Sequence, residues 1–213
     1  MPRLKVVDTV QPGPAPLPPP PKRSIATRVL GLAAKRRFGL PNFGVVEEGR
    51  IYRSAQLTES GLRRVVSEYG IRTVIALNEQ DAIGEREERI CRELGVSRLA
   101  FPWVGDGSVP PEVAARTMFA IAEQDHWPLL IHCHAGAQRT STVVLLYRYL
   151  YQGLRVRHTY PEHFHYKHSP RQWKVLAYLV DYMADIKAEL ARLEAQDAAH
   201  PDHLGVTESP SQP

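Results

Sequence analysis

The sequence has only two cysteines among its 213 residues, too few for the disulfide framework that holds small secreted proteins together. It has no apolar run near the ~20 residues that a helix needs to cross a bilayer, and we expect no cleavable signal peptide. It also lacks a nucleotide-binding fingerprint and an internal repeat. These absences predict a cytoplasmic protein without a transmembrane segment and without a cofactor.

Basic charge is concentrated at the N-terminal end of the chain. Residues 1–40 contain eight Lys and Arg against Asp8 alone, a balance of +7, whereas the remaining residues carry −3. The net charge of +4 therefore comes from the N-terminal region and gives no sign that the rest of the chain binds nucleic acid. We expect no nucleic-acid partner.

Composition divides the chain into a central domain and terminal extensions. Seven prolines between Pro12 and Pro21 favour an extended polyproline-type tail. Ser24 can cap a short basic helix, which either docks on the domain or, over residues 23–38, contacts an anionic membrane or partner. The expected parts are a disordered tail at 1–22, a basic and helical extension at 23–41, a folded domain at 42–190 and a disordered tail at 191–213.

Hydrophobic periodicity in the central part alternates between strand and helix. A hairpin of Val45–Glu47 and Ile51–Arg53 precedes a helix over Thr58–Tyr69 and a buried strand over Ile71–Leu77. The order then continues with a helix (Gly84–Leu94), a strand (Ser97–Phe101), a helix (Pro111–Gln124), a strand (Pro128–Ile131), a helix (Thr140–Tyr151) and at least two further helices through Ile186. This order predicts an α/β fold with a parallel-rich central sheet flanked by helices on both faces.

The run from His132 to Ser141 carries the clearest chemistry. It joins a buried strand to the start of a helix, where backbone N–H groups and the helix dipole favour an anion. Cys133 is the expected nucleophile, since this setting and a nearby cation lower the pKa of a thiol. Arg139, six residues later, can grip two phosphate oxygens with its planar fork. The pattern therefore indicates Cys-dependent hydrolysis of a phosphate ester.

The other residues of the run have supporting roles. Gly136 permits a crowded or left-handed backbone where the loop closes, and the Thr140 hydroxyl can stabilise the sulfur as a leaving group. His132 is expected to orient the loop, a role that suits it better than catalytic base. The expected substrate-binding positions are His134, Ala135, Gly136, Ala137, Gln138 and Arg139, with their backbone amides directed at the phosphate.

The Cys-x5-Arg-Thr motif preceded by His resembles the Cys-based protein tyrosine and dual-specificity phosphatases. The segments Val45–Gln56 and Gly70–Asn78 resemble the compact atypical dual-specificity group of plants, fungi and bacteria, and the likeness covers roughly residues 42–185. The resemblance implies a dual-specificity-phosphatase-like fold at 42–190 and a substrate that is a phosphoprotein, a small phosphorylated metabolite or an inositol pyrophosphate. Some members have basic residues where this chain has Ala137 and Gln138, which argues against a highly anionic polyphosphate.

Asp106 is the expected general acid, because an alkoxide or phenoxide leaves poorly without a proton. It lies in the loop Phe101–Pro110, which follows a parallel strand and should therefore open at the same sheet edge as the Cys133 loop. The alternative is that Asp106 only forms a turn, since Gly-Asp-Gly is turn chemistry in its own right.

Further interpretations of the sequence remain open. The loop can recognise a phosphorylated partner without turnover, or Cys133 can transfer sulfur through a persulfide. The histidines at 158, 163, 165 and 168 can be taken as a metal site, but no cysteine or carboxylate is suitably interspersed, so we expect a polar surface helix and no metal.

Arg53 either reaches the pocket rim or forms a structural salt bridge.

Overall fold

The computed structural model describes residues 2–7, 40–78, 81–167 and 174–199. Within these residues, five strands form one sheet in the order β1-β2-β5-β3-β4. The pairs β2–β5, β5–β3 and β3–β4 are parallel, whereas β1 pairs with β2 as the predicted antiparallel hairpin. The strands are β1 (Gly44–Glu47), β2 (Ile51–Ala55), β3 (Thr73–Ala76), β4 (Ser97–Ala100) and β5 (Leu129–Cys133).

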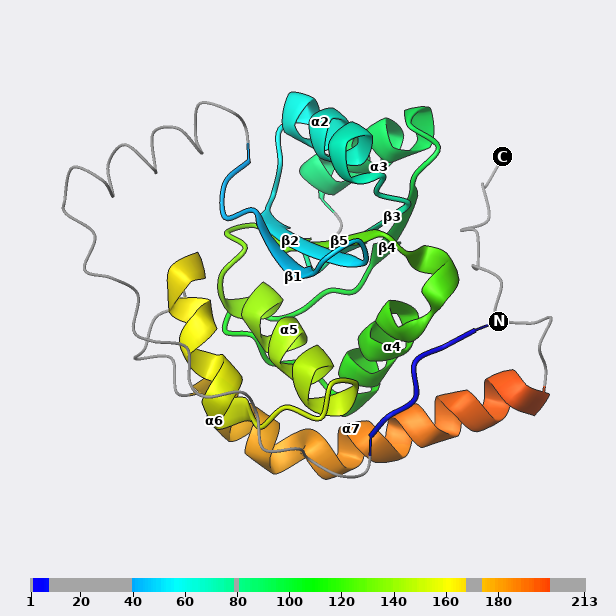
Figure 1. The fold of residues 1–213 in the computed structure, drawn as a ribbon, viewed down its shortest axis with the longest axis vertical. Coiled ribbons are helices and arrows are strands. Elements are labelled where there is room, and N and C mark those ends of the chain that lie inside the picture. Colours follow the sequence, from blue (N-terminus) through cyan, green and yellow to red (C-terminus); the bar gives the residue numbers. More distant parts are fainter. Residues whose placement is uncertain (1, 8–39, 79–80, 168–173, 200–213) are drawn as a thin grey trace.

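Helices cover both faces of this sheet, as predicted. Helices α2 and α3 lie on one face, and α4, α5 and α7 lie on the other (Figure 1). The helical segments are α2 (Glu59–Tyr69), α3 (Ala82–Glu93), α4 (Pro111–Ala122), η1 (Gln124–His126), α5 (Gln138–Leu150), α6 (Val156–Thr159), η2 (Tyr160–Tyr166) and α7 (Lys174–Ala199). The α/β fold with a parallel-rich sheet is therefore confirmed.

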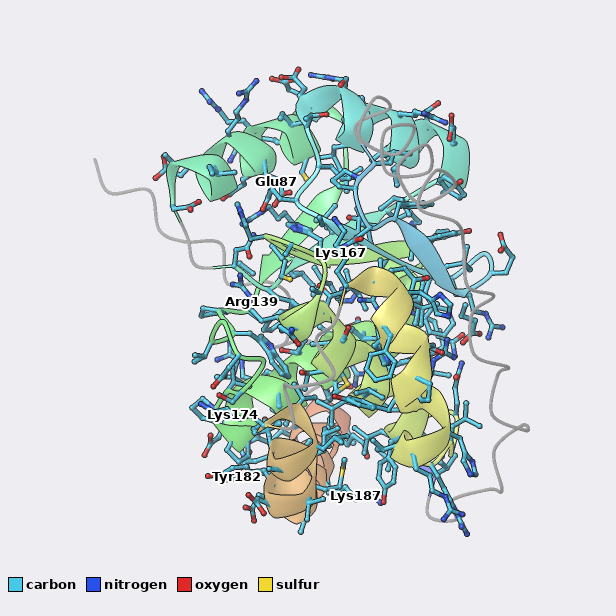
Figure 2. All side chains as sticks on the ribbon, turned by 90° about the vertical axis from the view of Figure 1, so that its left-hand side faces the viewer. Glu87, Arg139, Lys167, Lys174, Tyr182 and Lys187 are labelled. Carbon is cyan, nitrogen blue, oxygen red and sulfur yellow. The ribbon has the colours of Figure 1, made fainter. Side chains whose placement is uncertain are left out.

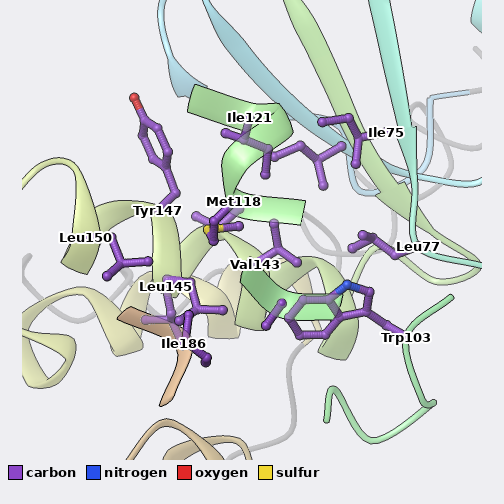
Figure 3. Close-up of a cluster of buried hydrophobic side chains, with 14 of the residues drawn as sticks. Ile75, Leu77, Trp103, Met118, Ile121, Val143, Leu145, Tyr147, Leu150 and Ile186 are labelled. Atoms are coloured by element: carbon purple, nitrogen blue, oxygen red, sulfur yellow. The ribbon is translucent and has the colours of Figure 1, made fainter. Parts of the chain in front are cut away.

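In the part of the chain that the structure describes, the core consists of two hydrophobic clusters, one on each side of the sheet. The larger cluster joins the sheet to α4, α5 and α7, and it includes Trp103, Met118 and Ile186 (Figure 3). The smaller cluster packs α2 and α3 against the opposite face through residues such as Leu62, Val65 and Ile90. Every residue of β5 is buried, because β5 lies between β2 and β3 and is covered on both faces.

The register of the central strands places their carboxyl ends side by side. Ala55 of β2 pairs with Cys133 of β5, and Ala76 of β3 pairs with His132. Loops that follow adjacent parallel strands open at the same edge of a sheet, where α/β proteins commonly bind ligands. The Cys133 loop is therefore flanked by the segments that follow β2 and β3.

The prediction that residues 1–22 form a tail separate from the core is wrong for residues 2–7. The backbone of this segment bonds to α4 and α5, with Leu4 N donating to Ala122 O (2.9 Å) and Val7 N to Leu150 O (2.8 Å). The Arg3 guanidinium lies 3.6 Å from the centre of the Phe119 ring and pairs with Glu123 and Asp197. These contacts hold the N-terminal segment along α4 and α7 (Figure 1).

The predicted C-terminal boundary at residue 190 is also wrong, because α7 continues to Ala199. Leu190 is buried, and Asp197 forms an ion pair with Arg3. The last turns of this helix are therefore part of the folded unit. Residues 8–39, which include the rest of the proline-rich tail and most of the basic extension, lie outside the described residues, as do residues 200–213. No helix in the described part of the chain is both long and apolar enough to cross a membrane.

Deletion of residues 1–7 should lower the melting temperature without impairing hydrolysis of a small aryl phosphate. Partial burial of Leu4 and Val6 is worth roughly 2 kcal/mol, which corresponds to a fall of about 4–8 °C for a domain of this size. The segment bonds to the carboxyl ends of α4 and α5, whereas the Cys133 loop lies at the start of α5.

Thermal melts of the truncated and full chains test this expectation. Lys5→Ala is the matched control, because Lys5 is exposed within the same segment. A melting temperature unchanged by the deletion would show that the docked segment contributes nothing to stability.

Candidate active site

The segment between Cys133 and α5 forms a tight loop that only glycine can close. Gly136 has a φ of +63°, and a Cβ at this position would overlap the backbone of Ser54 and Ala55 at the end of β2. Both the left-handed conformation and the close approach exclude larger residues. The Gly136 position predicted from the sequence therefore fixes the loop against the neighbouring strand.

The scaffold binds the carbonyl groups of the loop from outside. His132 O accepts from Leu77 N (2.9 Å), His134 O from Gln56 N (3.2 Å), Ala135 O from Asn42 Nδ2 (2.6 Å) and Gly136 O from Arg53 Nη2 (2.9 Å). In a trans peptide the carbonyl and the following N–H point in opposite directions. Holding the carbonyls outward therefore turns the amides that follow them toward the inside of the loop.

The Cys133 thiol lies at the centre of this arrangement and is buried. Burial by itself raises its pKa, but the Thr140 hydroxyl and amide, the Arg139 charge and the Ala137 amide together bring the pKa below the usual value. The loop thus favours the thiolate, which is the nucleophilic form of cysteine.

Arg139, in the first turn of α5, is anchored by a backbone carbonyl. One nitrogen, Nη1, donates to the Leu77 carbonyl at 3.2 Å, which anchors the side chain. Among the described residues, no carboxylate lies within 4.0 Å of its guanidinium. On the face shown in Figure 2, Arg139 lies between the labelled Lys167 and Lys174.

His132 connects the end of β5 to α3. Its Nε2 lies 3.1 Å from Glu87 Oε1, and the Glu87 carboxylate also accepts from Arg98 Nε at 2.9 Å. These hydrogen bonds lower the pKa of Glu87 despite its burial. The His132 side chain is therefore fixed by a buried carboxylate.

The same carboxylate reaches the loop by a second route. Gln56 donates to Glu87 Oε1 (2.7 Å), Asn78 donates to Gln56 Oε1 (2.6 Å), and Asn78 Oδ1 accepts from the His134 amide (2.8 Å). The His134 amide is thus held by Asn78, in contrast to the expectation that all amides from 134 to 139 face the phosphate. The side chains of His134 and Ala135 are exposed.

The family to which the chain belongs follows from its match to a family model. Residues 39–179 match the family described as DSP-PTPase phosphatase fused to NAD+ kinase. The chain belongs to this phosphatase family. Together with the loop geometry, this assignment makes the protein a Cys-dependent phosphatase of the protein-tyrosine and dual-specificity type.

Solved structures share the fold of the phosphatase at low sequence identity. The core catalytic domain of the PP-IP phosphatase SIW14 from S. cerevisiae has a TM-score of 0.57 and 18% identity, over 71% of this chain and 95% of that chain. TpbA from P. aeruginosa has a TM-score of 0.56 and 20% identity, over 72% and 91%. Tk-PTP in the G95A mutant form has a TM-score of 0.52 and 21% identity, over 72% and 97%.

Asp106 in the phosphatase lies in a loop that contacts the start of α5. A Cβ on the neighbouring Gly107 would lie 2.5 Å from Thr142 Oγ1 and 3.5 Å from Gln138 O. The Asp106 carboxylate accepts from the amide (3.1 Å) and hydroxyl (2.6 Å) of Ser108, which lower its pKa. Asp106 therefore forms a turn with Ser108, which was the alternative to the acid role. This turn lies next to the Cys133 loop.

The sequence interpretation missed most of the residues that support the loop of the phosphatase. Asn42, Gln56, Asn78 and Glu87 were not singled out, although Gln56 and Asn78 end the two segments that carry the family resemblance. The expectation of a polar surface helix is wrong for His163, which is fully buried with Nδ1 3.0 Å from Arg53 Nη1. His168 lies outside the described residues, and no metal-ligating cluster occurs among the described ones.

Proposed function

We propose that Cys133, Arg139, Asp106 and Thr140 carry out phosphate monoester hydrolysis in two steps. In the first, Cys133 Sγ attacks phosphorus, the ester P–O bond breaks, and Asp106 gives its proton to the departing oxygen. In the second, water attacks phosphorus, Asp106 takes a proton from that water, and the P–S bond breaks. Inorganic phosphate leaves, and Thr140 stabilises the returning thiolate.

One observation carries this proposal: a buried thiol of lowered pKa lies beside an arginine whose charge no described carboxylate neutralises. An anion-binding loop of this kind stabilises the negative charge on the equatorial phosphate oxygens in both steps. Arg139 supplies two donors in one plane, and the inward amides supply the remainder.

The acid role of Asp106 requires its carboxylate to turn from Ser108 toward the leaving group. The contact between the Asp106 loop and the start of α5 supports this role, because α5 directly follows the Cys133 loop. Lys174 Nζ, 3.9 Å from Asp106 Oδ2, is a second group that keeps the carboxylate ionised in the present arrangement.

For the substrate, we propose a phosphate monoester on a protein side chain or a small metabolite. Among the structural neighbours, SIW14 is a PP-IP phosphatase and TpbA occurs in complex with pTyr. Ala137 and Gln138 add no positive charge next to Arg139, which favours a single phosphate over a pyrophosphate. Turnover of a panel of phosphotyrosine, phosphoserine and phosphothreonine peptides and inositol phosphates tests this: preference for an inositol pyrophosphate would contradict it.

The expected location is the cytoplasm. Both cysteines are free, and a thiolate nucleophile needs reducing surroundings to stay active. The partners that this proposal implies are the phosphorylated substrates themselves.

Arg139→Lys should weaken phosphate binding and reduce kcat/KM by roughly 10²–10³-fold, the usual cost of losing one transition-state donor. Lysine keeps the charge but presents a single ammonium in place of a planar fork. Steady-state kinetics with an aryl phosphate and inhibition by inorganic phosphate measure both effects. Wild-type kinetics in this variant would remove Arg139 from the site.

A further inference from the structure

Arg53 lies in the middle of β2, directly beneath the Cys133 loop. Its side chain is 1% exposed, so it reaches neither the pocket rim nor solvent. Of the two sequence interpretations, rim or salt bridge, the structure supports neither, since no described carboxylate lies within 4.0 Å of this guanidinium. Burying a charge is costly, so a buried arginine without a direct carboxylate partner among the described residues must be stabilised by other contacts.

Polar contacts of Arg53 tie three parts of the fold together. Nη2 donates to the Gly136 carbonyl (2.9 Å) and to the Ser141 hydroxyl (3.1 Å), which belong to the loop and to α5. Nη1 lies 3.0 Å from His163 Nδ1 of η2. The guanidinium also stacks on the Tyr166 ring, with 3.8 Å between its central carbon and the ring centre.

The contact with Gly136 determines how the next amide points. The Gly136 carbonyl and the Ala137 N–H belong to the same peptide plane and point in opposite directions. Because Arg53 holds the Gly136 carbonyl on the outside of the loop, the Ala137 N–H points inward to the Cys133 sulfur. There it favours the thiolate. Arg53 thus acts on the sulfur through one peptide group.

The charge of Arg53 also faces the anion site from below. Burial lowers its pKa to about 10, which leaves it protonated at neutral pH, and the Cys133 thiolate is among the charges that oppose this shift. The carboxylate of Glu162 is engaged by Arg148 at 3.0 Å and lies 4.0 Å from His163, on the far side of that ring from Arg53. Within the described part of the chain, no direct ion pair therefore cancels the positive charge under the loop.

We propose that Arg53 is a positioning residue for the phosphatase reaction, which fixes the Gly136–Ala137 peptide and adds a buried positive charge beneath the bound phosphate. This inference rests on the proposed role of the Cys133 loop as the phosphate site. Arg53 does not touch substrate. It acts through the loop, and it connects the loop to η2 through His163.

Arg53→Met and Arg53→Lys test the proposal. Loss of a charge-assisted hydrogen bond typically corresponds to a roughly 10- to 100-fold effect, so we expect Arg53→Met to weaken inhibition by inorganic phosphate by that factor. Iodoacetamide alkylation of the peptide that contains Cys133 should require a higher pH. Arg53→Lys keeps the charge but cannot span Gly136, Ser141 and His163, so its phosphate affinity should fall between those of wild type and Arg53→Met.

Arg3→Met is the matched control, because Arg3 also stacks on an aromatic ring and is largely buried, but binds α4 and α7. It should lower stability and leave phosphate inhibition and the alkylation profile unchanged. Wild-type phosphate inhibition and alkylation in a folded Arg53→Met protein would overturn the proposal. Should that variant not fold, Arg53→Lys carries the test, and wild-type values there would overturn it equally.

The experiments distinguish failure of the Arg53 proposal from failure of the proposed function. If the inference is wrong, the wild-type chain still hydrolyses phosphate esters, Cys133→Ser still abolishes turnover, and only the Arg53 variants behave as wild type. If the proposed function is wrong, Cys133→Ser retains turnover whatever the Arg53 variants show.

Discussion

Replacing Cys133 with serine should abolish turnover, with a loss of at least ~10⁴-fold, while inorganic phosphate still binds. The serine hydroxyl cannot be ionised at neutral pH by the groups that ionise the thiol, so the nucleophile is lost. The outward-held carbonyls, the inward amides and Arg139 do not depend on the sulfur and remain in place. This variant should therefore lose turnover but keep its affinity for phosphate.

Kinetics and phosphate binding of the purified variant check this expectation. Cys91→Ser is the matched control, because Cys91 is buried in α3, within the smaller core cluster, and burial raises its pKa to about 12. It should cost stability but retain turnover of the folded protein. Appreciable activity of Cys133→Ser, with contamination excluded, would overturn the nucleophile assignment.

Asp106→Asn should slow hydrolysis according to how much the leaving group needs a proton. General acid catalysis is typically worth ~10²–10⁴ in rate, so unactivated alkyl and aryl phosphates should lose about that factor. A nitrophenyl ester, whose leaving group is already stable as an anion, should lose less in the first step. Rates across esters of graded leaving-group acidity measure the effect.

The pH profile gives an independent readout of the same residue. The pKa of Asp106 lies below its usual value, because Ser108 donates to the carboxylate. The protonated acid is therefore lost as pH rises through this low pKa, whereas the Cys133 thiolate forms as pH rises through its own lowered pKa. Wild-type kcat/KM should thus be highest on the acidic side, with a basic limb that Asp106→Asn flattens.

Ser108→Ala is the matched control for the turn. It removes the hydroxyl that holds the carboxylate, so it should raise the pKa of Asp106, move the basic limb to higher pH and spare the leaving-group dependence. A uniform loss across all esters in Asp106→Asn, with the basic limb intact, would mean that Asp106 only shapes its loop.

The sequence predicted the parts of the fold that depend on local pattern. The hairpin before α2, the alternation of strands and helices, and the loop between β5 and α5 all follow from hydrophobic spacing and glycine placement. Gly136 is the clearest example, because the need for a left-handed residue is visible from the motif itself. The family resemblance then predicted the phosphatase fold.

Long-range polar contacts were beyond sequence reasoning. Nothing in a local pattern pairs Arg53 with His163, 110 positions away, or His132 with Glu87, 45 positions away. Arg53 meets His163 where η2 contacts β2, and His132 meets Glu87 where α3 contacts the end of β5. Arg3 was likewise assigned to a tail on composition, although its partners Glu123 and Asp197 lie in distant parts of the chain.

The most direct test of the central claim is to trap the covalent intermediate. The chain is mixed with an activated aryl phosphate, quenched within the first turnover under conditions that preserve a thiophosphate bond, digested and analysed by mass spectrometry. The mechanism predicts one phosphoryl group on the peptide that contains Cys133, and none on that peptide in Cys133→Ser. Turnover without a phosphoryl group on Cys133 would contradict the mechanism. So would a phosphoryl group on another residue that is still present when Cys133→Ser is treated in the same way.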